Sequence, residues 1–564
     1  MTATGSTATI GDFLLRRLKE AGIAHAFGVP GDYNLEFMQQ IEDSDAVAWV
    51  GTCNELNASY AADGYARLNG LGAVVVTNGV GALSAINGIA GAYSEHVPVV
   101  CICGCVPQVA REQGRLMHHT LADGGRDEFI RAYAQVTAAQ ARITPQNAVD
   151  EIDRVIRTAW LLKLPVYLEL PSDVAYLDVR VPDEPLRLTP PDSDRERLAS
   201  AARAIAARFT AAKAPAVLID VDADRFGVAG EIVELAEKLR LPVAAALTVK
   251  GVIDETLPCW IGLYDGAGSA TGVRAAVENS DCLLAVGYRR VDLTSGYFSD
   301  NLPADTIHVR GYSADVDGEN FQAVGLKELL RAVVDAVAPA PTPAQVPAAA
   351  ARTEPAAVAG PLTQVALWQA VQGHIRAGDV IVTEDGTSDV GGWGLELPAG
   401  CTIVTQAVWG SIGYSVGSLL GTLFAAPERR HLLIVGDGSF QLTAQELSTV
   451  LRHDLKPVIL LVNNGGYTIE RAILGRNAHY NDVANWAYAE LPRVFRPDGN
   501  SASFRVQTVE QLHKALDTDH DGLVFIEAVL GRDDAPAGLI AGGHALADLD
   551  YGPRGPQGRP GIQL

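Results

Sequence analysis

The 564-residue sequence has little basic charge and few aromatic residues. Lys and Arg total 44 against 67 Asp and Glu, the formal net charge is -23, and Phe, Trp and Tyr make up 6% of the chain. Phosphate backbones and anionic lipid repel such a chain, so we expect neither nucleic acid nor a membrane as a partner. The same field repels anionic substrates, and any anion site must therefore be built locally.

Long hydrophobic runs are also missing. No uninterrupted apolar stretch approaches the roughly 20 residues that a membrane-spanning helix needs. The first residues lack the basic end, apolar core and cleavage site of a signal peptide. Instead Phe13, Leu14, Leu18 and Ile23 have helical spacing, which predicts an amphipathic first helix. We therefore expect a soluble, cytoplasmic protein.

Cysteine is scarce as well. The chain has seven, an odd number that does not suggest a disulfide framework. Cys101, Cys103 and Cys105 alternate in VPVVCICGCVP, which allows a metal cluster or three small thiols on one face of a buried strand. We favour the strand, because C-x-C-x-C lacks the C-x2-C geometry of zinc knuckles.

A complete dinucleotide-binding glycine motif is absent. Gly79 and Gly81 follow an apolar run, but the position that would complete G-x-G-x-x-G is Ser84. This argues against a dinucleotide-dependent oxidoreductase. The two glycines are equally typical of tight strand-to-helix packing.

What the sequence does have is a regular alternation of short apolar runs and helical stretches. The runs are rich in Val, Ile and Leu, and several end in Gly, Asp or Asn, which predicts parallel strands buried under helices. They are residues 73–77, 98–104, 164–170, 215–220, 282–287, 379–384, 431–438, 457–464 and 523–530. The expected fold class is α/β with three doubly wound parallel-sheet domains, whose ligands lie at the carboxyl ends of the strands.

Two shifts in composition divide the chain. Residues 183–196 are rich in Pro and charge, and residues 336–361 are almost entirely Ala, Pro and Val. The predicted organisation is listed in chain order: a domain at 5–182, a central domain at 197–335, an Ala/Pro linker at 336–361, a third domain at 362–535 and a C-terminal tail at 536–564. Residues 550–564 are rich in Gly and Pro and are expected to be disordered, with ALADLD (545–550) the only helical hint after residue 540.

Oxygen ligands gather after two runs of the third domain. Asp437, the Asn464 side chain and the Gly466 carbonyl can supply three protein ligands to Mg²⁺, which prefers a compact octahedron completed by phosphate and water. Gly438 allows close approach of a diphosphate, and Ser439 opens the next helix with a free hydroxyl. G-D-G followed one strand–helix–strand unit later by N-N is the spacing of a thiamine diphosphate site.

Glu55 is the complementary residue in the first domain. It opens a helix in CNELNASYAADGYAR, where a carboxylate usually serves the helix N-terminus. In a thiamine diphosphate enzyme the same carboxylate would bond the ring nitrogen of the aminopyrimidine and thereby favour the tautomer that deprotonates the thiazolium carbon.

From about residue 8 to 530 the sequence resembles the pyruvate, indolepyruvate, phenylpyruvate and branched-chain 2-keto acid decarboxylases. The matching stretches are FGVPGDYNL (27–35), NELNASYAADGYAR (54–67), MHHTL (117–121), WGSIGYS (409–415), GDGSFQLTAQEL (436–447) and NNGGYTIERAI (463–473). The resemblance implies pyrimidine-binding, central and diphosphate-binding domains, with thiamine diphosphate and Mg²⁺. The implied reaction is non-oxidative decarboxylation of a 2-oxo acid to an aldehyde and CO₂ through an enamine.

The resemblance also implies residue roles. Asp32, His118, His119 and Glu470 would shuttle protons after CO₂ leaves and help release the aldehyde. The residues implied to hold the cofactor, besides Glu55, Gly438 and Ser439, are Thr387 and Ser388 for the diphosphate, the Gly410 carbonyl for the amino group and Ile412 for the bent shape.

The implied substrate pocket departs from the family. Asp389 and Val390 stand where the family commonly has an aromatic pair, while Leu293 and Ile469 align with other pocket positions. We therefore expect a substrate larger than pyruvate. An anionic wall at Asp389 would favour a polar or cationic side chain. Alternatively Asp389 points to solvent or pairs with an Arg, and the substrate is aromatic or branched.

Two further classes remain as alternatives. A thiamine-dependent carboligase related to acetohydroxyacid synthase is disfavoured by the His pair and by the glutamate of YTIE. A non-catalytic scaffold would have a damaged Glu55 or His pair, and both are intact. Since the family builds each site between two subunits, we expect a homodimer or homotetramer.

Overall fold

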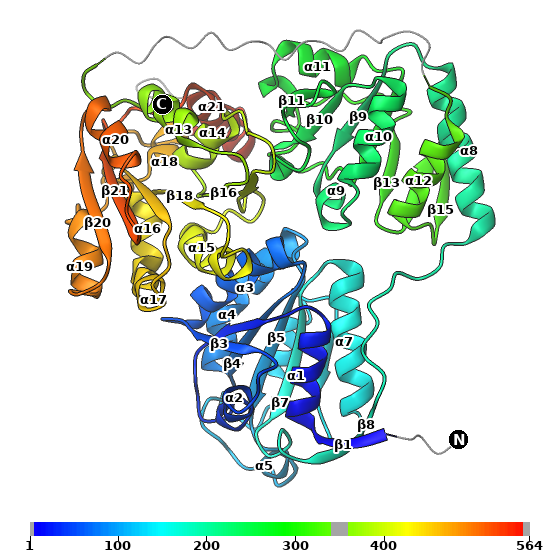
Figure 1. The fold of residues 1–564 in the computed structure, drawn as a ribbon, viewed down its shortest axis with the longest axis vertical. Coiled ribbons are helices and arrows are strands. Elements are labelled where there is room, and N and C mark those ends of the chain that lie inside the picture. Colours follow the sequence, from blue (N-terminus) through cyan, green and yellow to red (C-terminus); the bar gives the residue numbers. More distant parts are fainter. Residues whose placement is uncertain (1–4, 340–358, 557–564) are drawn as a thin grey trace.

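A computed structural model describes residues 5–339 and 359–556. Most of the expected linker at 336–361 and the last eight residues of the expected tail lie outside these ranges. The described chain forms three α/β units, each with a large sheet covered by helices (Figure 1). Within the described residues, every helix is too short or too polar to cross a membrane.

The first unit has a six-stranded parallel sheet in the order β3-β2-β4-β5-β7-β6. Its strands are β2 (His25–Gly28), β3 (Ala48–Gly51), β4 (Gly72–Thr77), β5 (Val99–Cys105), β6 (Gln140–Arg142) and β7 (Val166–Pro171). A separate antiparallel pair joins β1 (Gly5–Thr9) to β8 (Asp178–Pro182). The predicted first helix is confirmed as α1 (Ile10–Glu20), which buries Phe13, Leu14 and Leu18.

The three alternating cysteines lie on β5. Cys101, Cys103 and Cys105 all face one hydrophobic core, whereas Val100 and Ile102 face the core on the opposite side of the sheet. All three thiols are buried and free. The strand interpretation is therefore confirmed, because side chains alternate between the two faces of a strand.

The central unit has a seven-stranded sheet in the order β11-β10-β9-β12-β13-β14-β15. Its strands are β9 (Pro215–Ile219), β10 (Val243–Ala246), β11 (Trp260–Tyr264), β12 (Cys282–Val286), β13 (Ile307–Arg310), β14 (Ser313–Val316) and β15 (Glu319–Gln322). The last two are antiparallel, so this sheet is mixed rather than all parallel as expected. Two-residue turns join β13, β14 and β15, and turns that short can only reverse the chain.

The third unit has a six-stranded parallel sheet in the order β17-β16-β18-β19-β21-β20. Its strands are β16 (Val380–Thr383), β17 (Thr402–Val404), β18 (His431–Gly436), β19 (Val458–Asn463), β20 (Ser501–Val506) and β21 (Leu523–Val529). Because β18 and β19 are parallel neighbours, their carboxyl ends meet at one edge of the sheet.

The first and third units are joined by α3 (Glu55–Asn69) and α15 (Tyr414–Ala425), which pack against each other (Figure 1). Glycines bring the two backbones together. A methyl group placed on Gly421 would lie 1.9 Å from the carbonyl oxygen of Ala61, and one on Gly64 would lie 2.2 Å from that of Ser418. Only glycine fits at such distances.

The expected C-terminal tail contains a long helix. Helix α21 (Ala537–Tyr551) packs on α18 (Thr468–Ile473), so the helical hint at 545–550 captured only its second half. Its first half contains glycines that meet neighbours closely: a methyl group on Gly542 would lie 3.1 Å from the hydroxyl of Tyr297. The glycines hid this helix from propensity-based reasoning, since they disfavour helices except where packing requires them.

Candidate functional site

The predicted metal ligands meet where β18 and β19 end. Asp437 is 1% exposed, and its carboxylate accepts backbone hydrogen bonds from Gly438 (2.8 Å), Gly465 (2.7 Å) and Gly466 (3.1 Å). Burial raises the pKa of Asp437 to about 6. The Asp437 carboxylate and the loop that carries Asn464 are thus held together by direct hydrogen bonds.

The side-chain oxygen of Asn464 is buried and has no hydrogen-bond partner within the described residues. Buried polar atoms are rarely left unpaired, so such an atom in a loop whose backbone bonds a buried carboxylate indicates a ligand. An amide oxygen, a carboxylate and a backbone carbonyl form the donor set that Mg²⁺ accepts. The residues present therefore fit the predicted magnesium site.

Arg471 is a residue that sequence reasoning missed. It follows Glu470 on α18 and is 2% exposed. Its guanidinium donates hydrogen bonds to the carbonyls of Gly465 (2.7 Å), Asn464 (3.3 Å) and Asn481 (3.2 Å), and it pairs with Asp482 at 3.0 Å. Arg471 thereby holds the backbone of the predicted metal loop, which contains Asn464 and Gly465, in place.

The predicted diphosphate residues surround the same edge of the sheet. Ser388 lies on α14 (Thr387–Trp393), and its hydroxyl is buried with no hydrogen-bond partner within the described residues. Ser439 lies on α16 (Asp437–Thr443). A methyl group on Gly438 would lie 2.5 Å from the Tyr467 ring, so a glycine is required there. The buried residues Ser388 and Ser439, together with the open backbone at Gly438, fit an anionic group such as a diphosphate.

The segment with Gly410 and Ile412 links the first and third units. The hydroxyl of Ser411 is 2.7 Å from that of Tyr60, and it accepts from Asn87 at 3.0 Å. Gly410 has φ 59, a conformation that favours glycine. Ile412 is half-buried between these anchored residues.

Glu55 opens α3 where it was expected. The Asn54 side chain caps this helix by accepting from the Asn57 N–H at 2.8 Å. A methyl group on Gly81, at the start of α4 (Val80–Ser94), would lie 3.1 Å from the Glu55 carboxylate. The carboxylate is half-buried and faces this glycine.

The structure brings Asp32, His118 and His119 together. The Asp32 carboxylate lies 2.6 Å from Nε2 of His118 and 3.7 Å from Nε2 of His119. Tyr33 stacks on His118, with its hydroxyl 3.2 Å from Nδ1. The backbone of His119 has φ 55, and its carbonyl accepts from Asn78 at 2.8 Å. The cluster is built for proton exchange between a carboxylate and imidazoles.

Glu470 is not part of that cluster within one chain. It is exposed on α18 in the third unit. The loops with Asp32 and the His pair adjoin α2 (Leu35–Glu42) and α5 (Gln108–Glu112), which lie at the end of the first unit remote from the third (Figure 1). A single chain therefore keeps the two predicted sets of proton-transfer residues apart.

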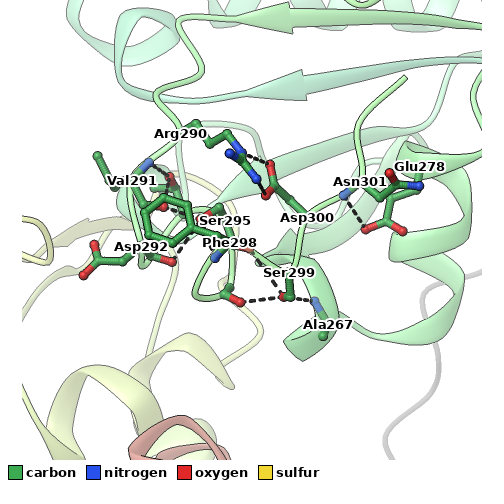
Figure 2. A network of polar contacts seen from close by, with 12 residues as sticks. Ala267, Glu278, Arg290, Val291, Asp292, Ser295, Phe298, Ser299, Asp300 and Asn301 are labelled. Atoms are coloured by element: carbon green, nitrogen blue, oxygen red, sulfur yellow. Dashed lines mark hydrogen bonds and ion pairs between the residues drawn. The ribbon is translucent and has the colours of Figure 1, made fainter. Parts of the chain in front are cut away.

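The predicted pocket residues come from three elements. Val390 on α14 contacts the start of α21, since a methyl group on Gly538 would lie 3.3 Å from it. Ile469 on α18 lies 3.9 Å from a methyl placed on Gly386. Leu293 is in the central-unit loop after β12, which Figure 2 shows tied by a bidentate Arg290–Asp300 pair at 2.8–3.0 Å.

Asp389 neither faces solvent nor forms an ion pair with an Arg in the described residues. Its carboxylate is 1% exposed and accepts from Thr405 at 2.5 Å, next to β17. Burial raises its pKa, and Arg67 lowers it without forming a direct ion pair in the described residues. The solvent-facing interpretation of Asp389 is wrong. The anionic pocket wall at Asp389 stays a prediction, and the contact with Thr405 does not support it.

Asp385 is a second residue that sequence reasoning missed. Asp385 lies in the E-D-G-T-S segment at 384–388, but the sequence does not show which groups surround its carboxylate. A methyl group on Gly410 would lie 3.3 Å from Oδ2 of Asp385. Burial, Asp389 and Glu470 raise the pKa of Asp385 to about 7, against the lowering effect of the Gly386 N–H.

Three family descriptions match the chain in order. They are the thiamine pyrophosphate enzyme N-terminal TPP binding domain over residues 8–124, the central domain over 202–337 and the C-terminal TPP binding domain over 389–528. The chain is similar to an "alpha-keto-acid decarboxylase" of Mycobacterium tuberculosis (strain ATCC 25618 / H37Rv), 41% identical over 541 residues that cover 94% of this chain and 95% of that protein. Proteins with the same name are 40% identical in Mycolicibacterium paratuberculosis (strain ATCC BAA-968 / K-10), covering 95% and 96%, and 39% identical in Mycobacterium leprae (strain TN), covering 94% and 95%.

Proposed function

Because this chain belongs to the thiamine pyrophosphate enzymes, we propose that it is a thiamine-diphosphate-dependent 2-keto acid decarboxylase. The bond between the carbonyl carbon and the carboxylate of a 2-oxo acid breaks, CO₂ leaves, and one proton is added to the carbonyl carbon to give an aldehyde. The relatives named alpha-keto-acid decarboxylase, which match almost the whole chain, support this reaction. The observation that carries the proposal is the buried Asp437 carboxylate, bonded to the backbone of the loop whose Asn464 side-chain oxygen is buried and unpaired in the described residues.

We propose that Asp437, Asn464 and the Gly466 carbonyl hold Mg²⁺. Thr387, Ser388, Gly438 and Ser439 then hold the diphosphate, and the Gly410 carbonyl and Ile412 orient the organic rings. When bound, thiamine diphosphate supplies the nucleophilic carbon and the electron sink of the reaction. In this assignment residues 362–535 form the diphosphate-binding domain, residues 5–182 the pyrimidine-binding domain and residues 197–335 the central domain.

The proton steps are assigned to side chains of both outer domains. Glu55 binds the pyrimidine ring and keeps a proton at its ring nitrogen. Asp32, His118 and His119 exchange protons through the 2.6 Å contact of Asp32 with His118, and Glu470 adds a fourth group. Imidazoles next to a carboxylate can give up and regain protons near neutral pH.

We propose that the complete site forms between two copies of the chain, in a homodimer or homotetramer. Helix α18, which carries Glu470, is far in Figure 1 from α2 and α5, which adjoin the loops of the Asp32 cluster, so a second copy is needed to bring these groups together. Large apolar side chains next to the predicted site residues are exposed in the single chain: Leu35, Val80, Leu83, Leu116, Leu121, Trp409 and Leu442. Apolar side chains gathered in this way are typical of a covered subunit interface.

We also propose a cytoplasmic location. All seven cysteines are free, including three that alternate along one strand, which fits a reducing compartment.

The first experiment measures products. The protein with Mg²⁺ and thiamine diphosphate is given a panel of 2-oxo acids, and aldehyde and CO₂ are expected in equal amounts. Acetolactate as the main product from pyruvate would replace the proposal with a carboligase.

The second experiment tests the shared site by mixing two inactive variants, Glu55→Gln and Asp437→Ala. If each site takes Glu55 from one copy and Asp437 from the other, mixed dimers hold one intact site. The mixture then regains about a quarter of wild-type activity after subunit exchange. No regain, with exchange verified by a mass tag, would contradict the two-chain site.

A further inference from the structure

Asp385 occupies a position that the proposed reaction does not use. It follows β16 directly, and its Oδ2 lies 3.3 Å from a methyl placed on Gly410, a residue of the proposed cofactor segment. It is close enough to Glu470, a proposed catalytic residue, for that carboxylate to raise its pKa. Asp385 therefore lies between the ring-binding segment and the reacting end of the site.

No cation compensates this carboxylate. Within residues 5–339 and 359–556, Asp385 forms no ion pair, and its polar contact is with the N–H of Gly386. Asp385 is half-buried, and removing a carboxylate from water without a paired cation is costly; burial here raises its pKa to about 7. An incoming positive charge would remove that cost. Asp389 also has no ion pair in the described chain, but its Oδ2 accepts from Thr405, while its Oδ1 is buried without a hydrogen-bond partner there.

The described elements that face Asp385 add further acidic and polar groups. Tyr297, in the central-unit loop, is half-buried, and burial together with Asp292, Asp265, Asp385 and Asp550 raises its pKa. Asp550 on α21 raises the pKa of Glu470. Neither Asp292 nor Asp550 forms an ion pair in the described chain.

The loop with Tyr297 is rigidly held. Arg290 pairs with Asp300. The Ser299 hydroxyl donates to the carbonyl of Gly296 and accepts from the N–H of Ala267 at 2.8 Å. Figure 2 shows that the Asp292 carboxylate points away from this network rather than into it. Helix α21 rests on the loop, since a methyl group on Gly542 would lie 3.1 Å from the Tyr297 hydroxyl. The acidic groups around Asp385 thus come from fixed elements of two domains.

We propose that Asp385 is a specificity-determining residue that binds a cationic side chain, guanidinium or ammonium, of the 2-oxo acid substrate. This inference rests on the proposed decarboxylase function and names its substrate class. The location of the site comes from the family segments, and the unpaired carboxylate beside Gly410 supplies the charge. A guanidinium fits best, because its planar set of N–H donors can bind the Asp385 carboxylate and the Tyr297 hydroxyl together.

The test compares two substrates of nearly equal shape, 5-guanidino-2-oxopentanoate and its neutral counterpart 5-ureido-2-oxopentanoate. The wild-type enzyme is expected to favour the guanidino acid in kcat/KM by about tenfold or more, which equals about 1.4 kcal/mol. In Asp385→Asn the ratio falls to near one, and Asp385→Glu, which keeps the charge, retains most of the preference. Asp519→Asn removes the same charge from an exposed position and leaves the ratio unchanged.

Each other outcome has a definite meaning. Decarboxylation of phenylpyruvate or pyruvate with no preference for the guanidino acid overturns the inference and leaves the proposed function intact. No aldehyde from any 2-oxo acid overturns the proposed function itself. Equal losses on both substrates in Asp385→Asn, with weaker thiamine diphosphate uptake by calorimetry, assign Asp385 to the cofactor and overturn the inference. If the Asp385 variants fail to fold, as judged by thermal unfolding, Tyr297→Phe replaces them, since it removes the hydroxyl that shares the guanidinium, and an unchanged ratio in it counts against the proposal.

Discussion

The metal end and the proton-transfer end of the site are built in opposite ways. Asp437 is 1% exposed and receives three backbone hydrogen bonds before any ligand arrives. In the Asp32–His118 pair, 46% and 58% of the side-chain surfaces are exposed. The difference teaches that one chain can preorganise its metal end alone, whereas its proton-transfer groups lie on an open surface that a second copy must cover.

The largest effect is expected at the buried end. Asp437→Ala removes a proposed metal ligand and leaves three N–H groups without their acceptor. Affinity for thiamine diphosphate in Mg²⁺ buffer is expected to fall by more than about 100-fold, with loss of turnover. Calorimetric titration of the purified variant measures this, and unchanged cofactor uptake would refute the metal assignment.

At the exposed end the loss should affect chemistry rather than binding. His118→Gln keeps a polar side chain beside Asp32 but cannot carry a proton as an imidazolium. We expect kcat to fall by about 10² to 10⁴ while cofactor uptake stays within a few-fold of wild type. Steady-state kinetics and calorimetry on one preparation separate the two. Equal losses in both would erase the contrast between the two ends.

A smaller effect is expected for Arg471→Lys, which sharpens the comparison by loosening the metal loop without touching a ligand. A lysine cannot reach the carbonyls of Asn464, Gly465 and Asn481 together, because it lacks the fork of a guanidinium. Mg²⁺-dependent cofactor affinity should weaken by about 10- to 100-fold. Arg476→Lys, whose partner Asp533 is on the surface, is the matched control and should bind normally.

The last prediction concerns the stability of the fold against pH and not the site. Glu384 is buried, accepts from Gly413 and Ser415, and has a pKa raised by burial to about 8. Since the folded protein favours the protonated form, this group stabilises the fold below about pH 4.5, and that contribution is lost as pH rises toward 8.

The loss amounts to about 1.4 kcal/mol for each unit of pKa shift that is titrated. Glu384→Gln stays neutral, so its unfolding free energy in urea should fall less than that of the wild type between pH 5 and 8. Parallel pH profiles would show that Glu384 does not titrate in this range.

The sequence was sufficient to predict nine of the twenty-one strands of the described chain. All nine apolar runs are strands, from β4 to β21, because strands buried on both faces are continuous blocks of Val, Ile and Leu. The other twelve strands escaped prediction, and clear cases are the short edge strands β3 and β17 and the antiparallel β14 and β15. These four strands are three or four residues long, and their side chains are partly exposed or polar, so hydrophobicity marks them weakly.

The site was predicted unevenly. Motif spacing placed Asp437 and Asn464 together, and the structure brings Asp32 to the His pair. By contrast, Arg471 stands inside a quoted motif and Asp385 precedes the predicted Thr387 and Ser388, but what they contact depends on other loops, such as Asn481 for Arg471 and Gly410 for Asp385. Asp389 shows the opposite error, since a notable substitution drew attention to a side chain that is bound by Thr405.

The bare-backbone contact of α3 with α15 has a mechanical consequence. Where Gly64 and Gly421 lie, no flexible side chains separate the helices, so neither helix can slide or rotate without main-chain atoms colliding. The first and third units must then travel as one rigid body. Any motion that admits substrate or releases aldehyde is confined to the covering parts: α21 and the central unit on which it rests.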